Sequence, residues 1–494
     1  MSKRDFDVLV IGGGSAGLTA SGMAASLGAR TALVESALPG GDCTWTGCVP
    51  SKALIKAARV AHDMRTADQY GLPASDPEID FARVMAHVRK IREEIYQDAD
   101  APDVITARGV ELITGRASFV DAHTLLIHSG ENEPRMVSSR YIVICAGASP
   151  RVPELPGIDR ADILTSSSLF EVNNRPDRLL VLGGGPIGIE MGQALQRLGC
   201  AVTIVERGER LLPETEPECS VVVQRTLENE GVRVLLSSMA EESQRGERGY
   251  EVQIATGEEQ WQTVECDKVL AAIGRQPNVG GLGLENAGVT YDAEGIAVNH
   301  SCQTNVDHIY ACGDIVKGGN FTHVAENMAK TAITRILLKI PASYEREAVP
   351  GVTFSDPECA GLGKTAQTLQ AKGERFRTIR FPFEKIDRGL IEKRSEGIIV
   401  IHSSLVTGRI LGAHIAGPNA GEMINELALA MKNGLTLRDI SQTVHAYPTW
   451  SLGVRRAADQ WYVQQGSPGL LKIIGSVFHF RGEVSSDIGT DNVV

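Results

Sequence analysis

The chain has 494 residues, which is too long for one hydrophobic core, so we expect roughly three domains. Its composition, 43% hydrophobic and 22% charged, is ordinary for a globular enzyme, and its formal net charge of −12 gives no support to a nucleic-acid partner. We expect a cytoplasmic protein with no transmembrane segment, because no apolar stretch is long enough to cross a bilayer and the N-terminus lacks a secretory signal. Nine scattered cysteines, an odd number, also argue against a secreted disulfide framework.

A dinucleotide-binding fingerprint opens the chain. An apolar strand at 8–11 runs into Gly12, Gly14 and Gly17, and a helix and a second strand then lead to Glu35, 18 residues after the last glycine. The first glycine allows the tight turn, the second lets the backbone approach a pyrophosphate, and the third permits close packing of helix and strand. The pyrophosphate would lie at the helix N-terminus, and the acid would bind a ribose hydroxyl.

Two cysteines follow in the stretch 40–52, which reads Gly-Gly-Asp-Cys-Thr-Trp-Thr-Gly-Cys-Val-Pro-Ser-Lys. A helix that begins near Gly41 would place Cys43 and Cys48 about a turn and a half apart, close enough to join with modest distortion. The helix N-terminus and Lys52 would both stabilise a thiolate, the reactive form of cysteine. The alternative is a buried pair of unreactive cysteines.

The pattern of residues 8–35 recurs 171 residues later, with Gly183, Gly185 and Gly188 in the turn and Glu206 at the position of the acid. A lone glycine fingerprint is weak evidence. Two copies with one offset, matched strands and matched acids are strong evidence, and they predict that the chain binds two dinucleotides. Further along, strands are expected at 352–358 and 409–417, and an amphipathic helix at 422–433.

The thiol pair and the repeated fingerprint resemble the flavoprotein disulfide reductases of class I, the family of dihydrolipoamide dehydrogenase, glutathione reductase and mercuric reductase. The resemblance covers the chain to about residue 462 and implies an α/β fold with two Rossmann-like dinucleotide-binding domains, for FAD and NAD(P), plus an α+β C-terminal dimerisation domain. The expected parts are an FAD-binding domain at 1–150 and 279–348, an NAD(P)-binding domain at 151–278, a dimerisation domain at 349–470 and a tail at 471–494.

The resemblance also assigns cofactor contacts. The stretch 304–314 is similar to the second FAD motif of the family, in which Asp314 would bind the ribityl chain, and the turns at Gly147 and Gly274 are similar to the crossings out of and back into the FAD domain. The expected FAD contacts are Gly12, Gly14, Gly17, Glu35, Gly41, Lys52, Gly147 and Asp314, and the expected NAD(P) contacts are Gly183, Gly185, Gly188, Glu206 and Gly274.

The second site should favour NADH over NADPH, because Glu206 would accept hydrogen bonds from the ribose and repel a 2′-phosphate. Arg207 and Arg210 follow closely and could offset that repulsion. By resemblance, Lys52 pairs with Glu190 beside the flavin N5, Cys48 lies against the flavin and Cys43 faces the substrate.

One family signature is altered. The family has His-x-His-Pro-Thr-x-x-Glu, whose second histidine reaches the other subunit's disulfide as acid and base, whereas residues 445–452 read His-Ala-Tyr-Pro-Thr-Trp-Ser-Leu. Tyr447 thus stands at the position of the catalytic histidine and Leu452 at that of its glutamate. A tyrosine can donate a proton but makes a poor general base. His445 remains an alternative base.

A tyrosine at this position is similar to mercuric reductase, although no metallochaperone domain precedes Met1 and the tail lacks that enzyme's cysteine pair. The resemblance implies a homodimer in which NAD(P)H reduces FAD, FAD reduces the disulfide, and the dithiol reduces a metal ion or a disulfide; no resident metal site is expected. The alternatives are a dihydrolipoyl dehydrogenase and a redox-sensing flavoprotein with low turnover. The apolar segment 470–481 is expected to pack on the dimer, or else to touch a membrane or a quinone.

Overall fold

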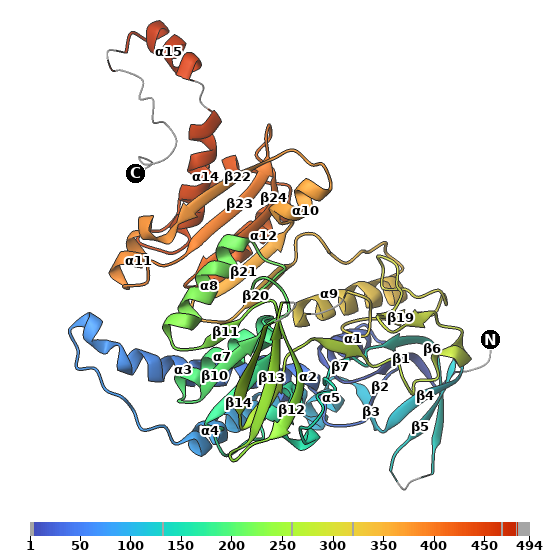
Figure 1. The fold of residues 1–494 in the computed structure, drawn as a ribbon. Helices are drawn as coiled ribbons and strands as arrows, with labels where there is room; N and C mark the ends of the chain where they lie inside the picture. The colour runs from blue at the N-terminus through green and yellow to red at the C-terminus, as the bar shows by residue number, and fades with distance from the viewer. Residues whose placement is uncertain are drawn as a thin grey trace.

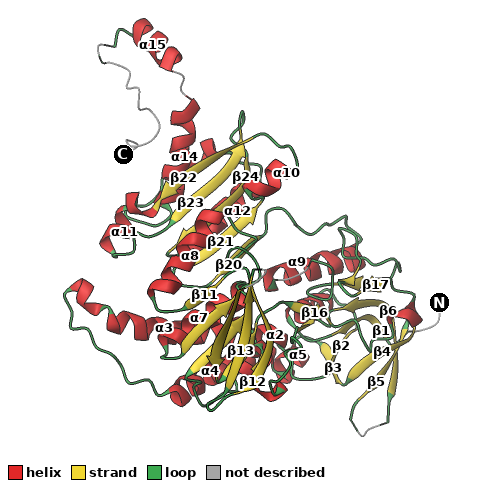
Figure 2. Cartoon of the chain, in the orientation of Figure 1, coloured by secondary structure: helices red, strands yellow, loops and turns green. Residues whose placement is uncertain are grey.

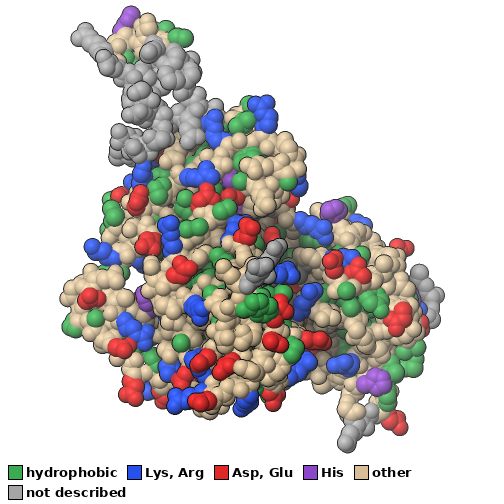
Figure 3. Space-filling model, viewed as in Figure 1, with side chains coloured by type: hydrophobic (Ala, Val, Ile, Leu, Met, Phe, Trp, Pro, Cys, Tyr) green, Lys and Arg blue, Asp and Glu red, His purple; other side chains and the backbone are tan. Residues whose placement is uncertain are grey.

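The computed structural model describes residues 4–130, 133–257, 260–318, 321–465, 468–480 and 482. The three largest sheets, two of them parallel or mainly parallel and one antiparallel, form the framework of the structure, each with helices packed on it (Figures 1 and 2). The predicted α/β class with two Rossmann-like units and a mixed C-terminal unit is confirmed. Acidic and basic side chains are interspersed over the face drawn in Figure 3.

The first sheet holds the first fingerprint. Its strands lie in the order β3-β2-β1-β6-β5-β4, with β19 also paired to β6. Near-continuous burial of β1 is typical of a parallel strand covered on both faces. The strands are β1 (Phe6–Ile11), β2 (Thr31–Glu35), β3 (Val110–Thr114), β4 (Arg116–Asp121), β5 (Thr124–His128), β6 (Arg135–Ile144) and β19 (Ile309–Ala311), and helices α1 (Ser15–Ser26) and α9 (Thr322–Ile333) pack together.

The second sheet holds the second fingerprint and has the order β11-β10-β9-β15-β8. A three-stranded antiparallel sheet lies beside it, and two short strands, β7 (Ala148–Pro150) and β16 (Arg275–Pro277), pair where crossings were predicted. The other elements are β8 (Ile163–Leu164), β9 (Arg178–Leu182), α7 (Pro186–Arg197), β10 (Ala201–Val205), α8 (Pro217–Asn229), β11 (Arg233–Leu235), β12 (Ser238–Arg245), β13 (Tyr250–Thr256), β14 (Gln260–Cys266) and β15 (Lys268–Ala271).

The third sheet is antiparallel, in the order β20-β21-β24-β23-β22. Helices α12 and α14 pack on one face, and α8 packs on the other, so the second and third sheets share a helix (Figure 1). The predicted strand at 352–358 is wrong as a single strand, since a loop at 354–357 divides it. The elements are β20 (Pro350–Thr353), β21 (Glu358–Gly363), β22 (Phe376–Pro382), β23 (Ile398–Ser404), β24 (Ile410–Gly417), α12 (Ala420–Lys432) and α14 (Leu452–Gln465).

None of the described helices has the length and apolar character needed to cross a membrane. The remaining elements range from two-residue strands to a helix of 18 residues. They are α2 (Gly41–Trp45), α3 (Cys48–Arg65), η1 (Ala67–Tyr70), α4 (Phe81–Ile95), η2 (Tyr96–Asp100), α5 (Pro102–Ala107), η3 (Arg160–Asp162), α6 (Ser166–Leu169), η4 (Leu284–Ala287), β17 (Tyr291–Asp292), β18 (Gly295–Ile296), η5 (Thr334–Leu338), α10 (Ala366–Ala371), η6 (Phe383–Lys385), α11 (Asp387–Ile391), α13 (Leu437–Gln442) and α15 (Pro468–Val477). The residues of the tail after 482 lie outside the described part.

The structure reproduces the repeat down to single backbone angles. Helices α1 and α7 begin and end at positions 171 residues apart. Gly12 and Gly183, the first glycines, have φ of +97° and +109°, a region in which only glycine is unstrained. A Cβ on Gly17 would lie 1.8 Å from the Gly12 carbonyl oxygen, and one on Gly188 would lie 2.0 Å from that of Gly183. The third glycine therefore lets the helix rest directly on its own turn.

Replacing Gly17 with alanine should destabilise the subunit, because the added carbon would overlap the Gly12 carbonyl. Overpacking costs about 1–3 kcal/mol, so calorimetry should show a lower midpoint of thermal unfolding. Gly22 is the matched control in the same helix, since a Cβ there would meet nothing within 4 Å. Gly22→Ala should keep or raise the midpoint, as alanine favours a helix over glycine by about 1 kcal/mol. Equal midpoints for Gly17→Ala and the unchanged protein would contradict this reading.

Candidate active site

The two cysteines lie on different helices. Helix α2 begins at Gly41 as predicted, but it ends at Trp45, and Cys48 is the first residue of α3. The predicted single helix is therefore wrong. Gly47 makes the break, and a Cβ on it would lie 2.8 Å from the Asp42 carbonyl oxygen. The predicted proximity is nevertheless present, because the thiols of Cys43 and Cys48, both free, hydrogen-bond to each other.

The hydrogen bond from Cys43 lowers the pKa of Cys48 to about 6, and the same contact raises the pKa of Cys43. The Thr322 hydroxyl, 3.6 Å from Cys48 Sγ, and the positive charge of Lys52 lower the Cys48 pKa further, while burial opposes them. These contacts therefore favour the thiolate on Cys48 and the protonated thiol on Cys43. Thr322 was not predicted, and it lies 274 residues away in sequence at the start of α9.

Lys52 and Glu190 form the ion pair that the resemblance implied. Lys52 Nζ lies 2.9 Å from Glu190 Oε2, and the Glu190 side chain is buried. The second oxygen, Oε1, accepts a hydrogen bond from the backbone N–H of Phe354 at 2.8 Å. The Phe354 ring also lies 4.4 Å from Lys52 Nζ, within the range of a cation–π contact. Phe354 is a contact of this pair that the sequence did not reveal.

A cleft of about 820 Å³ opens beside the first fingerprint. Gly12, Gly14, Glu35, Gly41 and Gly147 line it, five of the residues expected to contact FAD. The N-termini of α1 and α2 meet at its floor, where a Cβ on Gly41 would lie 2.6 Å from Gly14 Cα. Helix N-termini and a side-chain-free floor fit a pyrophosphate. Gly17 lies beneath the cleft, packed against its own turn. Lys52 does not line the cleft and lies near the thiols instead.

Asp314 lies with Arg275, whose Nε is 3.4 Å from Asp314 Oδ2. Burial raises the pKa of Asp314, and the arginine partly offsets this. Arg275 also pairs with Asp42, next to Cys43, yet its buried Nε has no hydrogen-bond partner within the described structure. Buried polar groups with unused hydrogen-bonding capacity fit a polyhydroxyl chain such as the ribityl group of FAD. Arg275 was not predicted, although it directly follows the expected Gly274.

Both acids hold their own glycine turns. Glu35 accepts hydrogen bonds from the backbone N–H of Gly13 at 2.5 Å and of Ala37 at 2.7 Å. Glu206 does the same with Gly184 and Gly208, each at 2.6 Å. The remaining lone pairs of each carboxylate can accept from a ribose hydroxyl, as the fingerprint requires.

The arginines after Glu206 differ in their contacts. Arg210 donates to the carbonyls of Thr215 at 2.9 Å and Pro213 at 2.6 Å, so its guanidinium holds its own loop. Arg207 makes no hydrogen bond among the described residues. The expected offset by Arg210 thus has no support in the geometry. Gly183, Gly185 and Gly188 form the turn before this acid, in the conformation of the first copy.

Tyr447 lies on the surface of the subunit, 69% exposed, while Leu452 is buried at the start of α14. No hydrogen bond or ring contact within the described part of the subunit joins Tyr447 to the thiols. His445 is occupied, because Nε2 lies 2.8 Å from Glu426 Oε1 and Nδ1 lies 2.9 Å from the Thr443 carbonyl oxygen. With both ring nitrogens engaged, His445 is not free to act as the alternative base.

The described residues contain no group of three or more histidine, cysteine, aspartate or glutamate side chains placed to hold a metal ion. The cradles, the half-buried Asp314 and the thiol pair instead fit a flavin dinucleotide and a second dinucleotide.

Two family models match the chain. The model described as pyridine nucleotide-disulphide oxidoreductase matches residues 6–329, and the model of the family's dimerisation domain matches residues 349–458. A mercuric reductase of Lysinibacillus sphaericus is 32% identical over 459 residues, covering 93% of this chain and 83% of that enzyme. A dihydrolipoyl dehydrogenase of Geobacillus stearothermophilus is 34% identical over 465 residues, covering 94% of this chain and 97% of that enzyme.

Solved structures agree with these sequence matches. LpdA from Mycobacterium tuberculosis superposes with a TM-score of 0.84 at 27% identity, covering 92% of this chain and 99% of its own. The Cu(II) complex of the HOCl-induced flavoprotein disulfide reductase RclA from Escherichia coli superposes with a TM-score of 0.80 at 25% identity, covering 93% of this chain and 99% of its own.

Once reduced, Cys48 should react with iodoacetamide as a thiolate even at mildly acidic pH. Because its pKa is lowered to about 6, the alkylation rate should rise as pH passes through that value and level off about one unit above it. Mass spectrometry of peptides separates Cys48 from Cys43, and Cys43→Ala should move the rise to higher pH by removing the largest stabilising contact. A rate on Cys48 that keeps rising up to the pH range of an ordinary thiol would show that the contacts do not stabilise its thiolate.

Proposed function

The chain belongs to the pyridine nucleotide-disulphide oxidoreductase family, and from that premise we propose that it carries two electrons from NADH through FAD to a Cys43–Cys48 disulfide and on to an acceptor. The family is FAD-dependent and uses a pyridine nucleotide. Bound FAD would supply the two-electron step between nicotinamide and disulfide. In total, NADH, one proton and the disulfide give NAD⁺ and two thiols. The two thiols then pass two electrons to the acceptor, release two protons and return to the disulfide.

The residues of the site have separate roles in this proposal. Cys48 holds the thiolate that Thr322 and Lys52 stabilise, and Cys43 exchanges with the acceptor. Glu190 keeps the Lys52 ammonium in place through the 2.9 Å ion pair. The glycine cradles with Glu35 and Asp314 would hold FAD, and the second cradle with Glu206 would hold the nicotinamide nucleotide.

We propose a soft metal ion as the acceptor, and the exposed Tyr447 carries this choice. A dithiol substrate must lose a proton before it attacks the disulfide, and neither Tyr447 nor the occupied His445 suits a base. A thiophilic ion such as Hg²⁺ or Cu²⁺ binds thiolates directly and brings no proton to remove. Similarity to mercuric reductases and to a reductase solved as a Cu(II) complex supports the same choice.

A dihydrolipoyl dehydrogenase is the second candidate, favoured by 34% identity over 97% of the Geobacillus enzyme. The third is a redox-sensing flavoprotein with low turnover. In each case we propose a cytoplasmic protein that forms a homodimer. We propose the homodimer because the segment with Tyr447 belongs to the dimerisation domain and would reach the thiols only of a second subunit. Exposed apolar side chains at Leu429 and Val444 beside it suit such an interface.

NADH should be used in preference to NADPH, because Glu206 is fixed by two backbone N–H groups where a 2′-phosphate would lie and Arg210 is turned away. Glu206→Gln removes the charge but keeps an acceptor, and it should narrow the NADH-to-NADPH ratio of kcat/KM by about tenfold, the equivalent of about 1.4 kcal/mol. Arg210→Gln is the control and should leave the ratio unchanged. An unchanged ratio in Glu206→Gln would remove Glu206 from the choice of nucleotide.

The acceptor is tested by following NADH oxidation with mercuric ion, cupric ion, lipoamide and a quinone offered separately, and dihydrolipoamide oxidation with NAD⁺. We expect turnover with a metal ion and slow turnover of dihydrolipoamide, since a missing general base costs about 10²- to 10⁴-fold. Tyr447→His should speed dihydrolipoamide oxidation without changing flavin reduction by NADH, and Tyr447→Phe is its control. Fast dihydrolipoamide oxidation by the unchanged protein would instead favour a dihydrolipoyl dehydrogenase. Absence of turnover with every acceptor would favour a redox-sensing flavoprotein.

A further inference from the structure

One face of α7 carries three buried polar side chains, Glu190, Gln193 and Arg197. Their spacing of three and four residues places them on the same side of the helix. All three contact residues 354–356 of the loop that joins β20 to β21 in the C-terminal sheet. Because buried polar groups are stable only when hydrogen-bonded, these contacts fix the loop against α7.

Gln193 clamps the backbone of Asp356 with two hydrogen bonds. Its Oε1 accepts from the Asp356 N–H at 2.7 Å, and its Nε2 donates to the Asp356 carbonyl oxygen at 2.7 Å. Two residues earlier, the Phe354 N–H donates to Glu190 and the Phe354 ring lies over Lys52. The loop that Gln193 clamps is therefore the loop that holds the ion pair next to the thiols.

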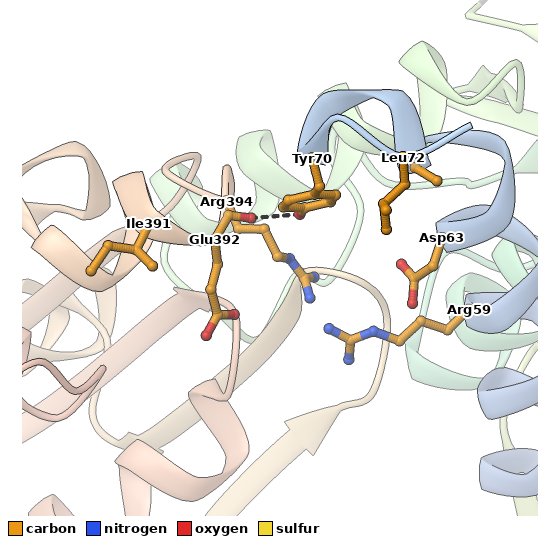
Figure 4. A pocket seen from close by; sticks show the side chains of 8 residues that line it. Arg59, Asp63, Tyr70, Leu72, Ile391, Glu392 and Arg394 are labelled. Carbon is orange, nitrogen blue, oxygen red and sulfur yellow. Dashed lines mark hydrogen bonds between the residues drawn. The ribbon is translucent and has the colours of Figure 1, made fainter. Parts of the chain in front are cut away.

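The Asp356 carboxylate is the point at which three parts of the chain meet. Arg197 of α7 lies 2.9 Å from it, Arg59 of α3 lies 3.9 Å from it, and Arg394, which follows α11, is also paired with it. Figure 4 shows Arg59 and Arg394 pointing toward each other across a pocket of about 460 Å³. Arg197 has a further partner in Glu230 at 2.6 Å, whereas Arg59 has no other ion pair within the described structure.

We propose that Asp356 is a positioning residue for the thiol chemistry, acting through Phe354 on the Lys52–Glu190 pair. This inference rests on the proposed function of the Cys43–Cys48 pair. The carboxylate holds together arginines that would otherwise repel one another, and the loop then presents its Phe354 N–H to Glu190 and its ring to Lys52. Lys52 held in this way keeps its charge near the Cys48 thiolate. A residue of the C-terminal sheet would thus set the reactivity of a cysteine on α3.

Asp356→Asn tests the inference, because the change is isosteric and keeps the backbone clamp of Gln193. Without the negative charge Arg59 and Arg394 lose their common partner, the loop loosens and Lys52 is less well held. We expect the Cys48 pKa to rise by about half a unit, which slows alkylation about threefold at a pH below the pKa. The lysine outweighs Glu190 in its effect on Cys48, so loosening both still raises the pKa.

The direction of the change in the Cys48 pKa distinguishes positioning by Asp356 from a direct Coulomb effect of its charge. Removal of a negative charge by Coulomb interaction alone would favour the thiolate and lower the Cys48 pKa. Arg59→Gln removes a positive charge, and it should raise the Cys48 pKa as Asp356→Asn does, because both disturb the same carboxylate. Asp63→Asn is the matched control: it removes the same charge from the wall of the same pocket without touching the loop 354–356, so the pKa should not rise.

The measurement is the pH dependence of Cys48 alkylation in the flavin-loaded protein, reduced with a phosphine so that it does not depend on NADH or on any acceptor. A higher Cys48 pKa in Asp356→Asn and in Arg59→Gln, with no increase in Asp63→Asn, supports the inference. An unchanged or lowered pKa in Asp356→Asn, or an equal increase in Asp63→Asn, overturns it. Absence of turnover with every acceptor would instead overturn the proposed function and leave this result standing.

Discussion

The structure depends on how closely each nucleotide-binding helix rests on the turn before it. With no side chain on Gly17, α1 lies against the Gly12 carbonyl, and its first N–H groups face the glycine turn. The start of α2 is packed on the same spot, where Gly41 touches Gly14. Cys43 lies in α2 and Cys48 begins the next helix, so the place of the thiols relative to the cradle depends on backbone contacts that no larger residue would allow.

Local pattern was enough to predict the repeat and the start of α2 at Gly41, because these depend on periodicity and turn chemistry, whereas the pairing of Lys52 with Glu190 was implied only by the family resemblance. It was not enough for contacts between distant segments: Thr322 and Arg275 lie 274 and 233 residues along the chain from Cys48 and Asp42, the residues they contact. The stretch 352–358 alternates like a strand, yet a loop forms there because the polar face of α7 binds its backbone. The break in the predicted helix at Gly47 was also not predicted. It depends on the close approach of Gly47 to the Asp42 carbonyl oxygen, which the sequence pattern does not indicate.

The thiol region brings several charged groups together around the exposed Cys48, and each charge has a specific partner. The Cys48 thiolate faces a hydroxyl and an ammonium, that ammonium faces Glu190, and Glu190 is completed by a backbone N–H. Such a chain resists reorganisation better than a single ion pair would, because each member has its position set from two sides. Tyr447 stands outside this chain, on the surface of its own subunit. Whatever it contributes to the chemistry therefore depends on association of two subunits.

The two fingerprint acids bind backbone N–H groups of their own loops. These hydrogen bonds help to hold each loop in one shape, which lowers the entropy cost of ordering the loop around a ribose. The same hydrogen bonds link recognition of the nucleotide to the rigidity of the loop. Any residue that replaces Glu206 must also replace two hydrogen bonds, to Gly184 and Gly208. A substitution at Glu206 therefore alters two things at once, the charge that faces the ribose and the hydrogen bonds that hold the turn.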